Sequence, residues 1–237
     1  MNLIPSTFGQ ELKRRKFLTG GASAAALALS GCASSPHVTG VERRRAISLK
    51  REQDTKFYSQ IYGPIRDEQF PIPAVRLNVV KPKFWRLEVP NTTGEAPGTI
   101  VVNTKTFHLF FTQKDGTAMR YGVGLGRAGF EWSGRARVAW KRAWPKWTPP
   151  AEMIERQPEL EKWSAANGGM PPGIENPLGA RALYIFEGGV DTLYRIHGSP
   201  EDFSIGKAVS SGCVRMLNHD VIDLFNRVPN NTPIVVL

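Results

Sequence analysis

At 237 residues the chain is long enough for one sizeable buried core and an appendage, and its 41% hydrophobic content fits a soluble globular domain. The formal net charge of +10 favours acidic surroundings: nucleic acid, anionic lipid headgroups or an anionic wall polymer, although a merely soluble basic surface also explains much of it. Since no run of Lys and Arg interleaved with aromatic residues stands inside the predicted domain, we expect no nucleic-acid partner.

Residues 1–31 are predicted to be an export signal. Lys13–Leu18 is a basic segment that resembles a twin-arginine signal, although any basic n-region would serve general export. Thr19–Ser30 is Ala- and Gly-rich and too short to span a bilayer. Leu29-Ser-Gly-Cys32 resembles a lipobox, in which cleavage before Cys32 leaves a lipid on that residue; the alternative is an incidental Cys after an ordinary cleavage site. We therefore expect an exported protein, lipid-anchored to a membrane at its periplasmic face.

Residues 32–73 are predicted to be a tether that leads into a catalytic domain at 74–237. Ala33–His37 is small and polar, which suits a flexible spacer next to a lipid anchor. A charged stretch at 42–52 is expected to be partly helical or to lie against headgroups. Four apolar residues in 57–62 are able to dock on the domain, so the tether need not be wholly disordered: Phe57, Tyr58, Ile61 and Tyr62.

From Val75 onwards the sequence alternates with a period of two. This pattern predicts strands over Val75–Val80, Arg86–Val89 and Thr106–Thr112. Lys114-Asp115-Gly116 is a hairpin signal, and Ala118–Gly124 is predicted to be the returning strand. Short strands separated by Gly and Pro favour an all-β sandwich or a barrel-like pair of sheets.

The segment Trp132–Gly179 holds five of the six Trp residues and many prolines. Short proline-started helices are expected at Pro150–Arg156 and Pro158–Ala166. Such a long insertion between strands is typical of a binding loop or lid. The alternative is a small apolar cluster beneath a loop.

Two short stretches carry the residues with reactive side chains. Leu193–His197 alternates and predicts a strand that ends in a turn at Gly198 and Pro200, and Cys213 follows Gly212 sixteen positions beyond His197. An imidazole beside a thiol can take its proton or stabilise its thiolate. Backbone N–H groups around Gly212 and Cys213 can hold a developing oxyanion. The plainer alternative is a small buried Cys and a satisfied His.

After this site, a helix is expected at His219–Arg227, capped by Asn218 and with Asp220 at its positive end, before a terminal strand over Pro233–Leu237. His219 is expected to be a surface or cap residue. The four His and the Cys residues have no metal-ligand spacing, so we expect neither a metal nor a cofactor.

The chain has two Cys residues. If Cys32 carries a lipid, Cys213 is the only free thiol of the mature protein and no internal disulfide forms. An unpaired thiol in an oxidising compartment is a liability, which is more easily understood if its chemistry is used.

An ordered set of motifs resembles the YkuD-type L,D-transpeptidases. The set comprises Pro97–Asn103, Asn176–Gly179 with the following Ala-Arg-Ala-Leu-Tyr, Ile196-His-Gly-Ser199, Ser204-Ile-Gly206 and Ser210-Ser-Gly-Cys-Val-Arg-Met216. The resemblance covers 97–237. It implies a mainly β, sandwich- or barrel-like catalytic domain with a few short helices and a long loop that acts as a lid over the catalytic groove.

The resemblance also implies the chemistry. Cys213 attacks the peptidoglycan tetrapeptide stem after its meso-diaminopimelate, expels D-alanine and holds the acyl group as a thioester. A stem amine as acceptor gives a 3→3 crosslink, and an envelope-protein amine attaches that protein to the wall. Water as acceptor makes the enzyme an L,D-carboxypeptidase. His197 is the implied general acid/base, its ring oriented by a backbone carbonyl.

The remaining candidate residues are predicted to shape the loops of the site or to bind the substrate. Arg215 is expected either to bind the stem carboxylate or to brace its loop, and Gly198 and Ser199 are expected to shape the turn. Ser211 departs from many relatives, which have His before the Gly-Cys pair, so it joins Gly212 only as an oxyanion or substrate-binding candidate. An alternative from a different functional class is a non-catalytic lipoprotein that binds the cell wall.

Overall fold

The computed structural model describes residues 54–126, 133–210 and 213–237. The predicted export signal, Cys32 and the tether up to residue 53 lie outside the described residues. Residues 54–61 are helical. The further elements are η1 (Pro82–Phe84), β1 (Leu87–Pro90), β2 (Ile100–Asn103), β3 (His108–Thr112), β4 (Thr117–Gly122), β5 (Gly124–Gly126), β6 (Gly134–Ala143), α2 (Ala151–Arg156), η3 (Pro158–Trp163), β7 (Arg181–Glu187), β8 (Val190–Ser199), η4 (Asp202–Ser204), β9 (Ala208–Ser210), β10 (Val214–Leu217), α3 (Asn218–Arg227) and β11 (Thr232–Val236).

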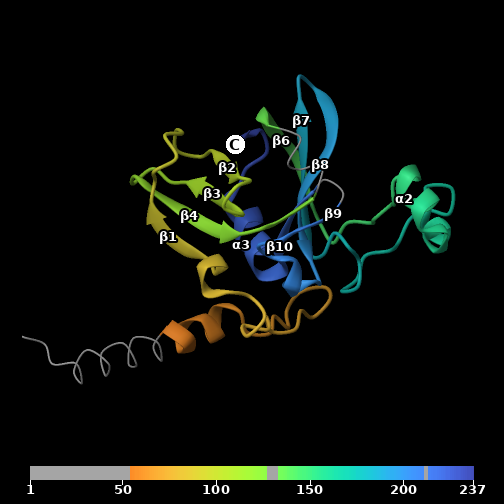
Figure 1. The fold of residues 1–237 in the computed structure, drawn as a ribbon, viewed down its shortest axis with the longest axis horizontal. Coiled ribbons are helices and arrows are strands. Elements are labelled where there is room, and N and C mark those ends of the chain that lie inside the picture. The colour runs from red at the N-terminus through yellow and green to blue at the C-terminus, as the bar shows by residue number, and fades with distance from the viewer. Residues whose placement is uncertain (1–53, 127–132, 211–212) are drawn as a thin grey trace, which may run out of the picture. The chain divides into compact units, whose positions relative to one another are not determined.

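The described strands form one hydrogen-bonded sheet in the order β1-β4-β3-β2-β11-β6-β7-β8-β10-β5-β9. Most neighbours are antiparallel, and the parallel pairs are β11 with β2, β10 with β8 and β5 with β9. The hairpin predicted at Lys114–Gly116 joins β3 to β4 and is confirmed. The predicted mainly β fold with a few short helices is confirmed as well (Figure 1).

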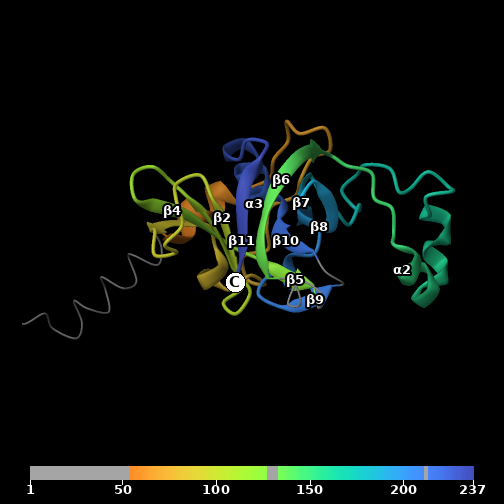
Figure 2. The same cartoon turned by 90° about the horizontal axis from the view of Figure 1, so that it is seen from above.

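The core is enclosed between the two halves of this sheet and α3. Its buried side chains come from both halves, for example Ile100 on β2 and Leu183 on β7, and α3 adds Val221 and Leu224. α3 packs against β7, β8 and β10. Figures 1 and 2 both show this helix between the β1–β4 strands and the β7–β10 strands. Among the described residues, no helix combines the length and the apolar character needed to cross a membrane.

The strand pairing has two irregularities, and the first of them decides where the Trp140 side chain points. The register of β6 against β7 shifts between Val138 and Trp140, so one residue is bulged. Val138 is fully buried, whereas Trp140 is 38% exposed. A bulge re-aims the side chains that follow it, and here it turns Trp140 to the other face of the sheet. β7 and β8 shift register between Tyr184 and Phe186.

The strand predicted over Val75–Val80 is wrong. Residues 77–79 form a hydrogen-bonded turn, with Val79 N donating to Arg76 O over 2.8 Å. Arg76 is held by Asp202, to which its backbone N–H and Nε both donate. The two buried valines of this segment, 75 and 80, dock into a second apolar cluster together with Tyr62. Burial at positions five apart does not follow a strand's period of two, so the alternation was accidental.

The predicted insertion Trp132–Gly179 is shorter than expected, because β6 occupies 134–143. The irregular segment between β6 and β7 carries α2 and the 3₁₀ helix η3, which contact each other and bury no side chain completely. In Figures 1 and 2 α2 stands apart from the sheet. The long loop is present, and its role as a lid stays a prediction.

Two predictions at α3 are wrong. Asn218 does not cap the helix: Leu217 is the N-cap residue, and the Asn218 amide oxygen instead accepts from Ala180 N over 2.9 Å. His219 is buried rather than on the surface, and its Nε2 lies 2.6 Å from the carbonyl oxygen of Gly63. Both side chains are recruited by chain segments distant in sequence, which local pattern does not reveal.

Candidate active site

His197 is a buried residue near the end of β8, with 4% of its surface exposed. Its Nδ1 lies 2.6 Å from the carbonyl oxygen of Gly198. Because a carbonyl only accepts, this contact assigns the proton to Nδ1 and leaves a lone pair on Nε2. The imidazole is thus oriented by a backbone carbonyl in the tautomer that a general base needs.

Cys213 directly precedes β10, which runs parallel to β8. The register pairs Val214 with Ile196 and Arg215 with His197. Val214 and Ile196 belong to the core. Because side chains alternate along a strand, Cys213 and His197 project from the opposite face, which we call the outer face. The structure therefore brings the predicted pair to the same face of two neighbouring strands.

Both groups are uncharged at neutral pH. Burial lowers the pKa of His197 to about 4, and the carbonyls of Gly198 and Pro177 oppose that shift only in part. Burial raises the pKa of the Cys213 thiol, against a smaller lowering by a backbone hydrogen bond from Arg195 and by two guanidinium groups. The substrate-free pair is a neutral thiol and a neutral imidazole, not a thiolate–imidazolium ion pair.

Arg215 is held by a carboxylate. Its Nη1 donates to Glu201 Oε2 over 2.5 Å, and the Glu201 side chain is 44% exposed. Ser199 Oγ accepts from the backbone N–H of Glu201 over 3.1 Å. In this structure Arg215 and Ser199 both brace the turn after β8, which is one of the two roles expected for Arg215.

Gly198 lies where three chain segments meet. A Cβ added there would stand 2.2 Å from Asn218 Oδ1 and 3.0 Å from Val221 Cγ1. Gly179, at a φ of +58°, has the same tight fit against Asn218 and against the Gly198 backbone. Glycine is needed at both positions because only a bare backbone fits. This contact fixes the end of β8 that carries His197.

Three of the predicted site residues lie outside the described residues: Ser211, Gly212 and Cys32. Sequence reasoning missed the contributions of Glu201, Asn218 and Arg195 to this site. Glu201 contacts Arg215, 14 residues away, and Asn218 contacts Ala180, 38 residues away. The contact of Arg195 with Cys213 depends on strand register. The tight Gly179–Gly198 contact likewise has no local signal. The motif Asn176–Gly179 marked the right segment without revealing its partners.

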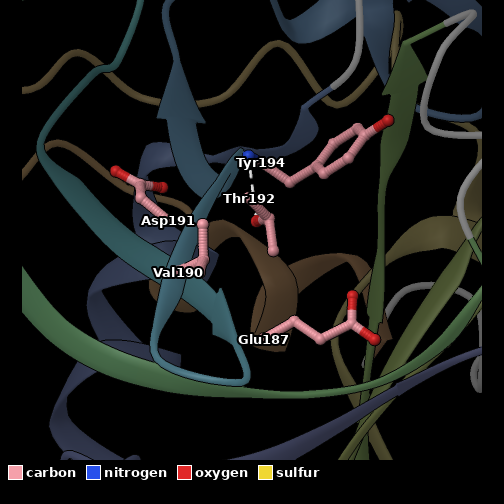
Figure 3. Close-up of a pocket in the computed structure, with 5 residues that line it drawn as sticks. All are labelled: Glu187, Val190, Asp191, Thr192 and Tyr194. Atoms are coloured by element: carbon pink, nitrogen blue, oxygen red, sulfur yellow. Dashed lines mark hydrogen bonds between the residues drawn. The ribbon is translucent and has the colours of Figure 1, made fainter.

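A hollow of about 430 Å³ lies at the β7–β8 hairpin, lined by Glu187, Val190, Asp191, Thr192 and Tyr194. In Figure 3 the Tyr194 ring and the Glu187 carboxylate project to one side of the hairpin and Asp191 to the other. Thr192 Oγ1 accepts from the backbone N–H of Tyr194 over 3.2 Å. None of the residues predicted from sequence lines this hollow.

Comparison with known proteins finds a match to one family model, that of the L,D-transpeptidase catalytic domain (YkuD), over residues 97–236. The probable L,D-transpeptidase YbiS of Escherichia coli K12 is 37% identical over 153 residues, which are 62% of this chain and 46% of that protein. The probable L,D-transpeptidase ErfK/SrfK of the same strain is 32% identical over 157 residues, 64% of this chain and 47% of that protein. This chain thus aligns with about half the length of these curated relatives.

Among solved structures, a probable carnitine operon oxidoreductase from Brucella melitensis is 44% identical and covers 68% of this chain and 99% of its own. Its TM-score is 0.47, at which the superposition carries no argument about fold or activity.

Proposed function

Because this chain belongs to the L,D-transpeptidase catalytic-domain family, we propose that it transfers the acyl group of a peptidoglycan stem peptide to an amine, with Cys213 as nucleophile and His197 as general base. One observation carries this assignment. The thiol and the imidazole share the outer face of two paired strands, and the imidazole is neutral in the tautomer that accepts a proton at Nε2.

The proposed first half-reaction begins from the neutral pair. His197 takes the thiol proton as Cys213 attacks the meso-diaminopimelate carbonyl carbon that is bonded to the D-alanine nitrogen. The tetrahedral intermediate collapses, the C–N bond breaks, and the imidazolium returns its proton to the departing D-alanine amine. The product is a thioester, which retains the acyl-transfer energy where no nucleotide is available.

In the second half-reaction an acceptor amine attacks the thioester and gives its proton to His197, which reprotonates the Cys213 sulfur as it leaves. A stem amine yields a 3→3 crosslink, and an envelope-protein amine attaches that protein to the wall. Water in the same position yields an L,D-carboxypeptidase. Backbone N–H groups around Gly212 and Cys213 are the proposed oxyanion donors.

The domain order completes the proposal: an export signal at 1–31, a lipid-anchored tether at 32–73 and the catalytic domain at 74–237. The protein would then work at the periplasmic face of a membrane, with the anchor at Cys32. Lipid labelling of the exported protein tests this part.

The catalytic part is tested by incubating the purified protein with tetrapeptide muropeptides, with and without an added amine, and analysing products by mass spectrometry. We expect D-alanine loss together with dimers, and a fall of at least about a thousandfold in rate for Cys213→Ala, since the nucleophile is removed. Release of D-alanine without dimers would favour the carboxypeptidase. Undiminished product from Cys213→Ala would remove Cys213 from the mechanism, and no product from the folded wild type would favour the wall-binding lipoprotein.

A further inference from the structure

Three side chains form a row across neighbouring strands on the outer face. Trp140 on β6 pairs with Tyr184 on β7, and Tyr184 pairs with Arg195 on β8. The Trp140 and Tyr184 rings are stacked, with centroids 3.5 Å apart and 11° between planes. The Arg195 guanidinium lies over the Tyr184 ring at 4.4 Å from its centroid. We call these three residues the aromatic row.

The row leads to the reactive sulfur. Since Val214 pairs with Ile196, the preceding Cys213 stands next to Arg195, from which it receives a backbone hydrogen bond. Trp140 and Cys213 are therefore at opposite ends of one line across β6, β7, β8 and β10. The row therefore ends beside the reactive sulfur.

The aromatic row does not contribute to the core. Neither Trp140 nor Tyr184 belongs to an apolar core cluster of the described residues, and Trp140 is 38% exposed. Without the bulge after Val138, simple alternation would have turned the Trp140 side chain towards the core. An indole held at the surface in this way offers a flat apolar face on which a ligand can stack.

The charges beside the row are basic. Arg137 and Arg142 lie on β6 on either side of Trp140, are exposed, and face the same way as it does. Across the residues that the structure describes, neither guanidinium is in an ion pair, whereas Arg195 is bound by Asp191 at 2.7 and 2.8 Å. Two cations beside an exposed ring suit a ligand that carries carboxylates.

The length of the line suits a short peptide. β6 and β10 are separated by three strand spacings, which amount to about 14 Å. An extended chain covers about 3.4 Å per residue, so the three stem residues before the scissile bond cover about 10 Å of this line.

We propose that the aromatic row, with Arg137 and Arg142, binds the acidic stem peptide of the acyl donor, its scissile bond at Cys213 and its remote carboxylates at the two arginines. The choice of peptide rests on the proposed function. The row thereby selects donors that carry carboxylates.

Binding is measured by calorimetry on the full chain carrying Cys213→Ala, which prevents turnover. The probe is a synthetic tetrapeptide stem that ends in meso-diaminopimelate–D-alanine. We expect Trp140→Ala, and separately the double substitution Arg137→Gln/Arg142→Gln, each to weaken binding about tenfold, and Trp140→Phe to retain most of the affinity. A peptide with amidated carboxylates should bind weakly and be insensitive to the arginine substitutions.

Matched controls lie elsewhere on the chain. Phe57→Ala removes an exposed aromatic ring from the helix at 54–61, and Lys105→Gln/Lys114→Gln removes two exposed charges from turns beside β3. Neither control should change affinity by more than about twofold. Equal weakening by a control and by its matched row variant, or no weakening by the row variants, overturns the proposal.

The same row variants in a chain with an intact Cys213 separate this inference from the proposed function. We expect a KM about tenfold higher with kcat within about twofold. If turnover depends on Cys213 but the row variants have the same KM as the wild type, the inference is overturned and the proposed function stands. If the row variants weaken binding but the wild type forms no product, the proposed function is overturned and the binding inference stands.

Discussion

At the scale of single residues, the surroundings of the partly buried Cys213 and of the buried His197 both favour the neutral forms of the two side chains. Desolvation lowers the pKa of His197 to about 4 and raises the pKa of Cys213. A neutral imidazole is a competent base at physiological pH, and a neutral thiol resists oxidation better than a thiolate does. On this view the sulfur is activated only when a substrate is in place.

This proton state predicts how Cys213 reacts with iodoacetamide. Because only the thiolate is alkylated, the rate should rise about tenfold per pH unit from pH 6 to 8 and show no plateau at low pH. His197→Gln should change the rate at pH 7 by less than about threefold, since a neutral ring contributes no charge. Peptide mapping by mass spectrometry follows the label at Cys213. A plateau below pH 7 that His197→Gln abolishes would instead indicate an ion pair.

At the scale of elements, the site depends on how closely β8, α3 and the chain at 176–180 approach one another. Asn218 on α3 accepts from Ala180 N, and Gly179 and Gly198 leave room for that amide. Asn176 closes the same segment on itself, with its amide nitrogen donating to Pro171 O over 3.0 Å. The segment that borders His197 is therefore held by packing and hydrogen bonds.

A comparison of two glycines distinguishes the cost of crowding from the cost of backbone strain. Gly179 and Gly188 have nearly equal φ values, +58° and +57°, but only Gly179 would have its new Cβ within 3 Å of other atoms. We expect Gly188→Ala to lower the free energy of unfolding by about 1 kcal/mol and Gly179→Ala by about 3 kcal/mol or more. Chemical denaturation measures both. Equal losses would show that the contact with Asn218 and Gly198 contributes little.

At the scale of the whole molecule, a buried polar cluster joins the start of the described chain to its last helix. The Tyr62 hydroxyl donates to Asp220 Oδ2 over 3.3 Å and accepts from Arg86 N over 2.7 Å. The Arg86 guanidinium also pairs with Asp223, at 3.1 Å. Tyr62, which lies in the segment predicted to be a tether, thus takes part in the packing around α3.

Asp220 makes stability depend on pH. Burial raises the pKa of this carboxyl to about 7, and Arg86 lowers it by less. The folded state therefore binds a proton that the unfolded chain, with a carboxyl pKa near 3.9, has already lost, so stability falls as pH rises from about 4 to 7. Asp220→Asn cannot ionise. We subtract the wild type's free energy of unfolding from that of Asp220→Asn. This difference should rise by about 3 kcal/mol between pH 5 and pH 8, because only the wild type loses stability over that range. A difference that is constant across this range would contradict the assignment.

The sequence alone determined what short-range pattern and motif order encode. The hairpin at Lys114–Gly116, the helix that ends at Arg227 and the last strand follow from local turn chemistry and periodicity. The ordered motifs from Pro97 to Met216 were sufficient to identify the family, as the match over 97–236 confirms. The catalytic roles of Cys213 and His197 stay predictions.

Tertiary structure decided what depends on partners distant in the chain. Asn218 binds Ala180 instead of capping its helix, Val75–Val80 is held as a turn next to Asp202, and Arg215 pairs with Glu201. The bulge that exposes Trp140 exists only as a mismatch between two paired strands, so it has no counterpart in either strand alone. A side chain's local preference is worth about 1 kcal/mol or less, and a buried hydrogen bond or a packed contact from another element outweighs it.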